Sequence, residues 1–166
     1  SGAPVQAYVR IDPDEITNHN EIREPDHVIV LDRTLIAPRV CAGMKPNGWL
    51  ILNTLGDPAA LGDSFSGRAV AAVDATAIAS SHGLGTRAVP IVNTTMMGAV
   101  AKVLEIPFAD VEAAFAALKF GGANLASARQ AYEQVVAQRL GGEIRPAALI
   151  APSAHIASLL DENLGA

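Results

Sequence analysis

The first half of the chain alternates apolar runs with turn-forming residues. Residues 5–11 carry apolar side chains at every second position, which is typical of a half-buried β-strand. Residues 27–31, 49–52 and 68–73 are instead nearly continuous apolar runs, and such runs are typical of strands in a parallel sheet that is covered on both faces. The pattern therefore predicts four strands, the last of which ends at Asp74.

The second half has the spacing of helices. Residues 75–81 form a short alanine-rich helical stretch that glycines terminate. Apolar residues at three- and four-residue intervals predict further helices over residues 96–104, 108–118 and 125–140. Glycine pairs follow the last two of these helices and would terminate them.

Strands separated by loops and helices favour an α/β fold with an open, mostly parallel sheet and helices packed on it in three layers. The chain has 166 residues, the length of one ordinary domain. We assign residues 1–141 to this domain. Residues 142–166 are weakly patterned, and we expect them to form a C-terminal tail that lies over a neighbouring subunit.

Composition indicates a chain that other proteins partly cover. Half of the residues are apolar and only 17% are charged, against about 25% in typical soluble proteins. A net charge of −5 opposes binding to nucleic acid or to anionic lipid. The apolar runs fall far short of the ~20 residues that span a bilayer, so we expect no membrane partner.

The sequence gives little support for redox, metal or hydrolytic chemistry by this chain alone. Cys41 is the single cysteine, so it forms no internal disulfide, and the chain cannot by itself ligate an iron-sulfur cluster. We expect a buried free thiol there. Four scattered histidines form no metal-ligand pair, and the sequence around Ser64 lacks the last glycine of a nucleophile elbow.

Three polar or glycine-containing segments have both a structural and a functional interpretation. Asp32 and Asp74 follow buried strands, where open parallel sheets bind ligands, but aspartates in such places more often cap the next turn. Gly83 and Gly85 are spaced like part of a nucleotide loop, yet they follow a helix, which favours a helix end and a turn.

The third segment, residues 93–99, places Asn-Thr-Thr before Met-Met-Gly-Ala. If a helix starts in this segment, the unpaired backbone amides of its first turn could bind a phosphate or a carboxylate. The alternative is a plain helix cap with a methionine-lined core face.

Six segments, read in order, resemble one known family. They are Ser1-Gly2-Ala3-Pro4-Val5, Tyr8-Val9-Arg10-Ile11, the Pro25-Asp26 segment that leads to Asp32, Asn53-Thr54, Val73-Asp74-Ala75-Thr76, and Asn93-Thr94-Thr95-Met96-Met97-Gly98-Ala99. Their order and spacing resemble the gamma subunit, or the equivalent fused domain, of the 2-oxoacid:ferredoxin oxidoreductases, the pyruvate:ferredoxin oxidoreductase family. The resemblance covers residues 1–118.

One feature of that family is missing. Its members normally begin with a strand, a Gly-Arg-Gly-Gly-Gln-Gly loop and a helix, which together take about 30 residues or more. The chain instead opens on Ser1-Gly2-Ala3-Pro4, without an initiator methionine or a secretory signal. We therefore expect that this N-terminal strand-loop-helix unit is absent from the chain or is supplied separately.

The resemblance implies an accessory role in a cytoplasmic complex. Thiamine diphosphate with Mg²⁺, [4Fe-4S] clusters and coenzyme A would be bound in the complex and not by this chain alone. The implied partners are alpha, beta and delta-type subunits, with ferredoxin or a flavin/NAD subunit as electron acceptor. The 2-oxoacid, from pyruvate to phenylglyoxylate, stays open. Residues that would face a cofactor are Gly2, Ala3, Pro4, Asn93 and Thr94.

Two other classes of function remain open. The chain could be a free-standing nucleotide-binding or regulatory α/β module, in which case the purified chain would bind a ligand. It could also be a purely structural interaction protein, in which case a complex without it would keep its decarboxylase activity.

Overall fold

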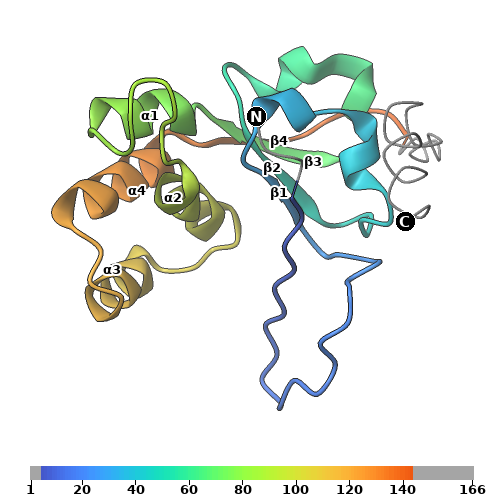
Figure 1. Ribbon diagram of the computed structural model, residues 1–166. Coiled ribbons are helices and arrows are strands. Elements are labelled where there is room, and N and C mark those ends of the chain that lie inside the picture. Colours follow the sequence, from blue (N-terminus) through green and yellow to red (C-terminus); the bar gives the residue numbers. More distant parts are fainter. Residues whose placement is uncertain (1–4, 144–166) are drawn as a thin grey trace, which may run out of the picture.

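Four strands form one open sheet in the order β1-β2-β3-β4 (Figure 1). The computed structural model describes residues 5–143. The strands are β1 (Val28–Val30), β2 (Trp49–Asn53), β3 (Ala69–Val73) and β4 (Val136–Arg139). The first three are parallel, and β4 runs antiparallel to β3. The predicted open, mostly parallel sheet is therefore confirmed.

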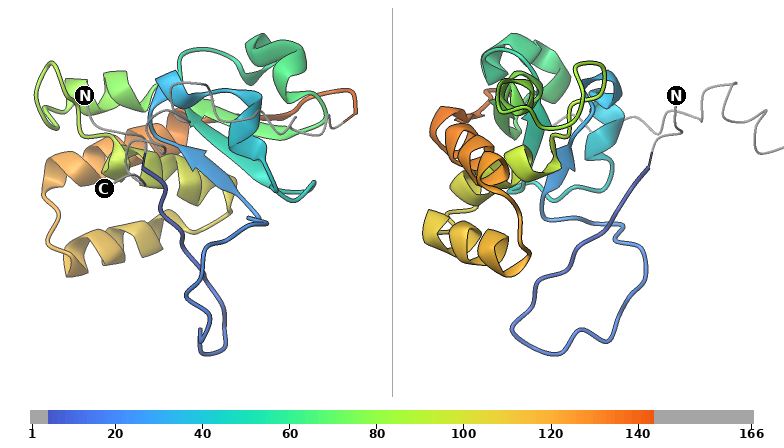
Figure 2. Two further views of the ribbon diagram at one scale, coloured as in Figure 1. Left: turned by 45° about the vertical axis from the view of Figure 1, so that its right-hand side comes forward. Right: turned by 60° about the vertical axis from the view of Figure 1, so that its left-hand side comes forward.

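Helices cover one face of this sheet, and short 3-10 segments cover the other (Figures 1 and 2). The helices are α1 (Ala75–Ser81), α2 (Asn93–Val103), α3 (Phe108–Ala117) and α4 (Gly122–Gln134). The 3-10 segments are η1 (Arg33–Leu35), η2 (Pro38–Cys41) and η3 (Pro58–Phe65). This arrangement confirms the predicted α/β class with three layers.

The central strand β2 has buried side chains on both faces. Ile51 packs with the helices, whereas Leu50 and Leu52 pack with the 3-10 segments, because successive side chains of a strand point to opposite faces. All three are fully buried. A continuous apolar run is therefore what this position requires, as the sequence pattern predicted.

Helices α2 and α4 approach each other closely at Gly98. A Cβ atom at this position would lie 1.7 Å from the carbonyl oxygen of Ala128, so only glycine fits without movement of the backbones. Beside this contact the Thr95 hydroxyl donates a hydrogen bond to Ser127 Oγ (3.1 Å). Both side chains are fully buried. The pair thus fixes the spacing of the two helices.

Two sequence predictions are wrong. Residues 5–11 form no strand: they are extended and exposed, because no strand of the described chain lies alongside to pair with them. The predicted helix over residues 125–140 ends at Gln134, and β4 follows. The reason is tertiary, because β4 pairs with the otherwise free edge of β3 and so completes the backbone hydrogen bonds of that strand.

The sequence also predicts a C-terminal tail over residues 142–166. Residues 144–166 of this tail lie outside the described residues.

We predict that Gly98→Ala destabilises the fold by about 1–3 kcal/mol, because the added methyl group must push α2 away from α4. Gly122→Ala is the matched control, since a Cβ there meets nothing within 4 Å. Urea unfolding of both variants measures the difference. Equal stability of the two variants would contradict the close-contact account.

Candidate functional site

The carboxyl edge of the sheet is held together by Asn53, the last residue of β2. Its side-chain Nδ2 donates hydrogen bonds to the carbonyl oxygen of Leu31 (2.8 Å) and to Thr76 Oγ1 (2.9 Å). Its Oδ1 accepts from the backbone N–H of Thr76 (3.2 Å). Asn53 is only 3% exposed. One buried amide therefore joins the ends of β1 and β2 to the start of α1.

The two aspartates at this edge act as caps. Asp32 Oδ1 accepts from the backbone N–H of Thr34 (2.9 Å) and from its hydroxyl (2.8 Å). These hydrogen bonds, the backbone one first, lower the pKa of Asp32. Asp74 Oδ1 accepts from the backbone N–H of Ala77 (2.9 Å) at the start of α1. The capping interpretation of both residues is confirmed.

The glycines after α1 likewise have a structural role. Gly83 and Gly85 have φ angles of +69° and +83°, a conformation that suits glycine. They end α1 and turn the chain toward a bridge between Gly85 and Pro90. The predicted helix end and turn are confirmed.

At the start of α2, the two candidate residues Asn93 and Thr94 lie in different environments. Thr94 is buried, and its hydroxyl donates to Asn124 Oδ1 of α4 (2.8 Å). Asn93 is exposed, and its Oδ1 accepts from the backbone N–H of Thr94 (3.0 Å). Met96 lies in the core, while Met97 is half exposed. The other three candidate residues, Gly2, Ala3 and Pro4, lie outside the described residues.

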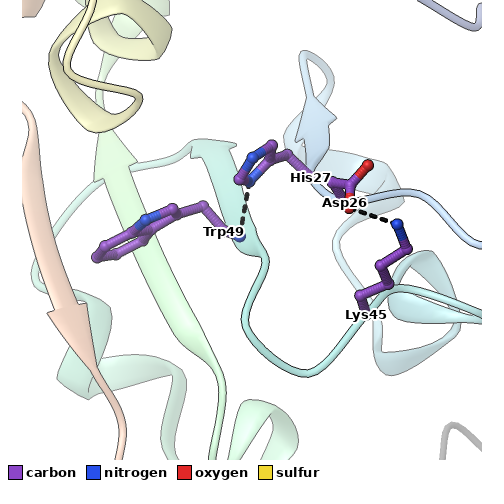
Figure 3. Close-up of polar contacts among 4 residues, drawn as sticks. All are labelled: Asp26, His27, Lys45 and Trp49. Atoms are coloured by element: carbon purple, nitrogen blue, oxygen red, sulfur yellow. Dashed lines mark hydrogen bonds and ion pairs between the residues drawn. The ribbon is translucent and has the colours of Figure 1, made fainter. Parts of the chain in front are cut away.

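A second polar group, which sequence analysis did not single out, lies at the amino ends of β1 and β2 (Figure 3). Lys45 Nζ donates to Asp26 Oδ1 at 2.6 Å, and this hydrogen bond is the main cause that lowers the pKa of Asp26. His27 Nδ1 accepts from the backbone N–H of Trp49 (3.1 Å). In the sequence, this polar group is indicated only by the turn-forming residues Pro25-Asp26 and Pro46-Asn47 before the two strands.

Asp26, His27 and Lys45 line an open depression of about 430 Å³. It holds an exposed ion pair and a histidine whose Nδ1 is already occupied. We assign it no catalytic role, because the charges are paired in solvent.

Across residues 5–143 the polar side chains form a structural network. Every buried side-chain nitrogen or oxygen there has a hydrogen-bond partner, and no three His, Cys, Asp or Glu side chains gather into a metal-binding group. Cys41 is a buried free thiol, as predicted, and burial raises its pKa although Arg68 acts in the opposite direction. None of the described helices is long and apolar enough to cross a membrane.

The described residues thus define an α/β domain with an open sheet whose edge groups bond to their own chain. Within that class, residues 1–134 match the family described as pyruvate ferredoxin/flavodoxin oxidoreductase. The chain belongs to this family.

Curated relatives and a solved structure agree with this assignment. Pyruvate synthase subunit PorC of Methanocaldococcus jannaschii is 39% identical over 142 residues, covering 81% of this chain and 74% of the relative. The pyruvate/ketoisovalerate oxidoreductases common subunit gamma of Thermococcus litoralis is 37% identical over 148 residues, covering 84% and 77%. The crystal structure of pyruvate oxidoreductase subunit PORC from Thermotoga maritima has a TM-score of 0.61 at 30% identity, covering 71% of this chain and 67% of that one.

We predict that Asn53→Asp destabilises the domain by about 1–3 kcal/mol. The carboxylate cannot donate to the Leu31 carbonyl, so a buried acceptor loses its partner. Asn47→Asp, in an exposed turn, is the matched control. Urea unfolding compares the two, and a stable Asn53→Asp variant would show that the edge does not depend on this amide.

Proposed function

We propose that this chain is the gamma-type subunit of a 2-oxoacid:acceptor oxidoreductase complex and covers part of its catalytic subunits. The complex would decarboxylate a 2-oxoacid oxidatively, with coenzyme A, to acyl-CoA, CO₂ and reduced ferredoxin or NADH. Family membership supports the reaction class, and the relatives' names support the subunit role. The relatives' names leave the particular 2-oxoacid open, since they include both pyruvate and ketoisovalerate enzymes.

The composition of the chain supports the proposal that other subunits hold the cofactors. A [4Fe-4S] cluster takes four thiolates, whereas this sequence has one cysteine. Among the described residues, no three His, Cys, Asp or Glu side chains gather into a metal-binding group. We propose that alpha, beta and delta-type subunits hold thiamine diphosphate, Mg²⁺ and the clusters, and that this chain excludes water from the site.

The observation that carries the subunit role is the uncovered side of β1. Ile29 pairs in register with Ile51 of β2, yet Ile29 is 44% exposed and Ile51 is fully buried. Leu31, two residues further on, is also 44% exposed. β1 is an edge strand of the sheet, and no other described strand pairs with its outer side. An apolar strand left open in this way is suited to burial against another subunit.

The start of α2 supports a contact with coenzyme A. The Thr94 hydroxyl bonds to α4, so Thr94 positions the beginning of the helix, and the neighbouring Asn93 is exposed. We propose that Asn93 and Thr94, with Gly2, Ala3 and Pro4, line the path by which coenzyme A reaches the catalytic subunits. Asn93 would make the contact, and Thr94 would hold the helix in place.

No observation favours a free-standing nucleotide-binding module. Such a site would need free polar groups at the carboxyl edge, but Asp32, Asn53 and Asp74 bond to their own chain. The other alternative, a purely structural interaction protein, is addressed by the experiments below.

Recovery of the complex tests the subunit role. Tagged wild-type chain is expected to co-purify with the thiamine diphosphate and iron-sulfur subunits, and Ile29→Glu is expected to reduce their recovery at least tenfold, because it places a charge on the uncovered strand. Leu118→Glu, an exposed position at the end of α3, is the matched control. If the wild-type chain purifies alone and binds a nucleotide, the proposed function is wrong.

Kinetics of the assembled complex tests the coenzyme A contact. Asn93→Ala removes one hydrogen-bonding side chain, so the KM for coenzyme A is expected to rise about 2- to 10-fold. Asn47→Ala, at the amino ends of the strands, is the control that leaves this KM unchanged. An unchanged KM and kcat in Asn93→Ala would remove Asn93 from the proposal.

A further inference from the structure

Helices α2 and α4 lie side by side and run in the same direction (Figures 1 and 2). Their contacts advance together along both helices and join Thr94 to Asn124, Thr95 to Ser127, Gly98 to Ala128 and Lys102 to Tyr132. The first turns of the two helices are therefore neighbours.

The first turn of α2 is not capped by the residue before it. Val92 precedes α2 and Gly121 precedes α4, and neither side chain can accept a hydrogen bond. Asn93 Oδ1 accepts from the backbone N–H of Thr94, but this bond lies within the turn and does not tie it to the rest of the domain. An uncapped first turn frays easily. The position of this turn therefore depends on its bonds to the neighbouring helix.

Asn124, in the first turn of α4, makes such a bond. Its side-chain Oδ1 accepts from the Thr94 hydroxyl (2.8 Å), and Thr94 is only 5% exposed, so water competes little for this bond. The next contact along α4 does not use this side chain. Ser127 Oγ donates to the backbone carbonyl oxygen of Asn124 (2.9 Å) and accepts from the Thr95 hydroxyl. Loss of the Asn124 side chain would therefore loosen the first turn of α2 and leave the deeper contacts in place.

We propose that Asn124 is a positioning residue for coenzyme A. It touches no substrate in this account; through the Thr94 hydroxyl it holds the first turn of α2, and with it Asn93, where Asn93 meets coenzyme A. The helix α4, about thirty residues further along the chain, thus sets the geometry of a contact made from α2. This inference rests on the proposed function, which gives Asn93 the contact itself.

Hydrogen exchange of the full-length chain tests the positioning without coenzyme A. The backbone N–H of Met96 donates to the Val92 carbonyl oxygen (2.8 Å) at the start of α2. In Asn124→Ala this amide is expected to exchange about 2- to 10-fold faster, because one hydrogen bond that holds the turn is lost. The amide of Val103, at the other end of α2, is expected to keep its wild-type rate.

Kinetics of the assembled complex tests the consequence. Asn124→Ala is expected to raise the KM for coenzyme A about 2- to 10-fold, and no more than Asn93→Ala does, with kcat within about twofold of wild type. Gln130→Ala is the matched control. Gln130 Oε1 also joins α4 to another helix, at 2.8 Å from His82 Nε2, but it does so away from the start of α2.

The double variant Asn93→Ala and Asn124→Ala separates positioning from direct binding. Because Asn124 acts through Asn93, the double variant is expected to have the KM of Asn93→Ala alone. A KM rise equal to the product of the two single rises would overturn the proposal, and so would wild-type exchange at Met96 or a wild-type KM in Asn124→Ala. If Asn93→Ala raises the KM and Asn124→Ala does not, the positioning role fails while the proposed function stands. If Asn93→Ala itself has no effect, the coenzyme A contact and the positioning role fail together.

Discussion

A strand in a parallel sheet needs apolar cover on both faces, and most of this structure follows from that constraint. β2 and β3 are covered by helices on one face and by 3-10 segments on the other, so Leu50, Ile51 and Val70 are fully buried. β4 completes the far edge by antiparallel pairing with β3. β1, the other edge strand, has an unpaired outer side within the described chain, and its Ile29 is 44% exposed.

The same network that holds the domain together leaves few polar groups for chemistry. Asn53 uses its amide to join two strand ends to α1, and Asp32 and Asp74 use their carboxylates as caps. The carboxyl edge, where open sheets of this kind bind ligands, is therefore occupied by structural bonds. Asn93 is exposed, and we propose it as a residue that contacts a ligand.

Local patterns predicted much of this fold, and nonlocal contacts explain the rest. The buried runs that become β2 and β3 and the spacing in α1, α2 and α3 reflect short-range rules, so they were predicted correctly. β4 was predicted as helix because its spacing continues that of α4, and pairing with β3 outweighed this preference. Residues 5–11 have the alternation of a strand, but a strand also needs a neighbour. The role of Asn53 depends on residues that are more than twenty positions away, which no local pattern contains.

The central claim is that β1 is completed by another subunit. Hydrogen exchange of the backbone amides, compared between the isolated chain and the assembled complex, tests it most directly. The account predicts that the amides of Ile29 and Leu31 exchange faster in the isolated chain and become strongly protected in the complex, while those of Leu50 and Ile51 are protected in both. Equal exchange at Ile29 and Leu31 in the two states would contradict it.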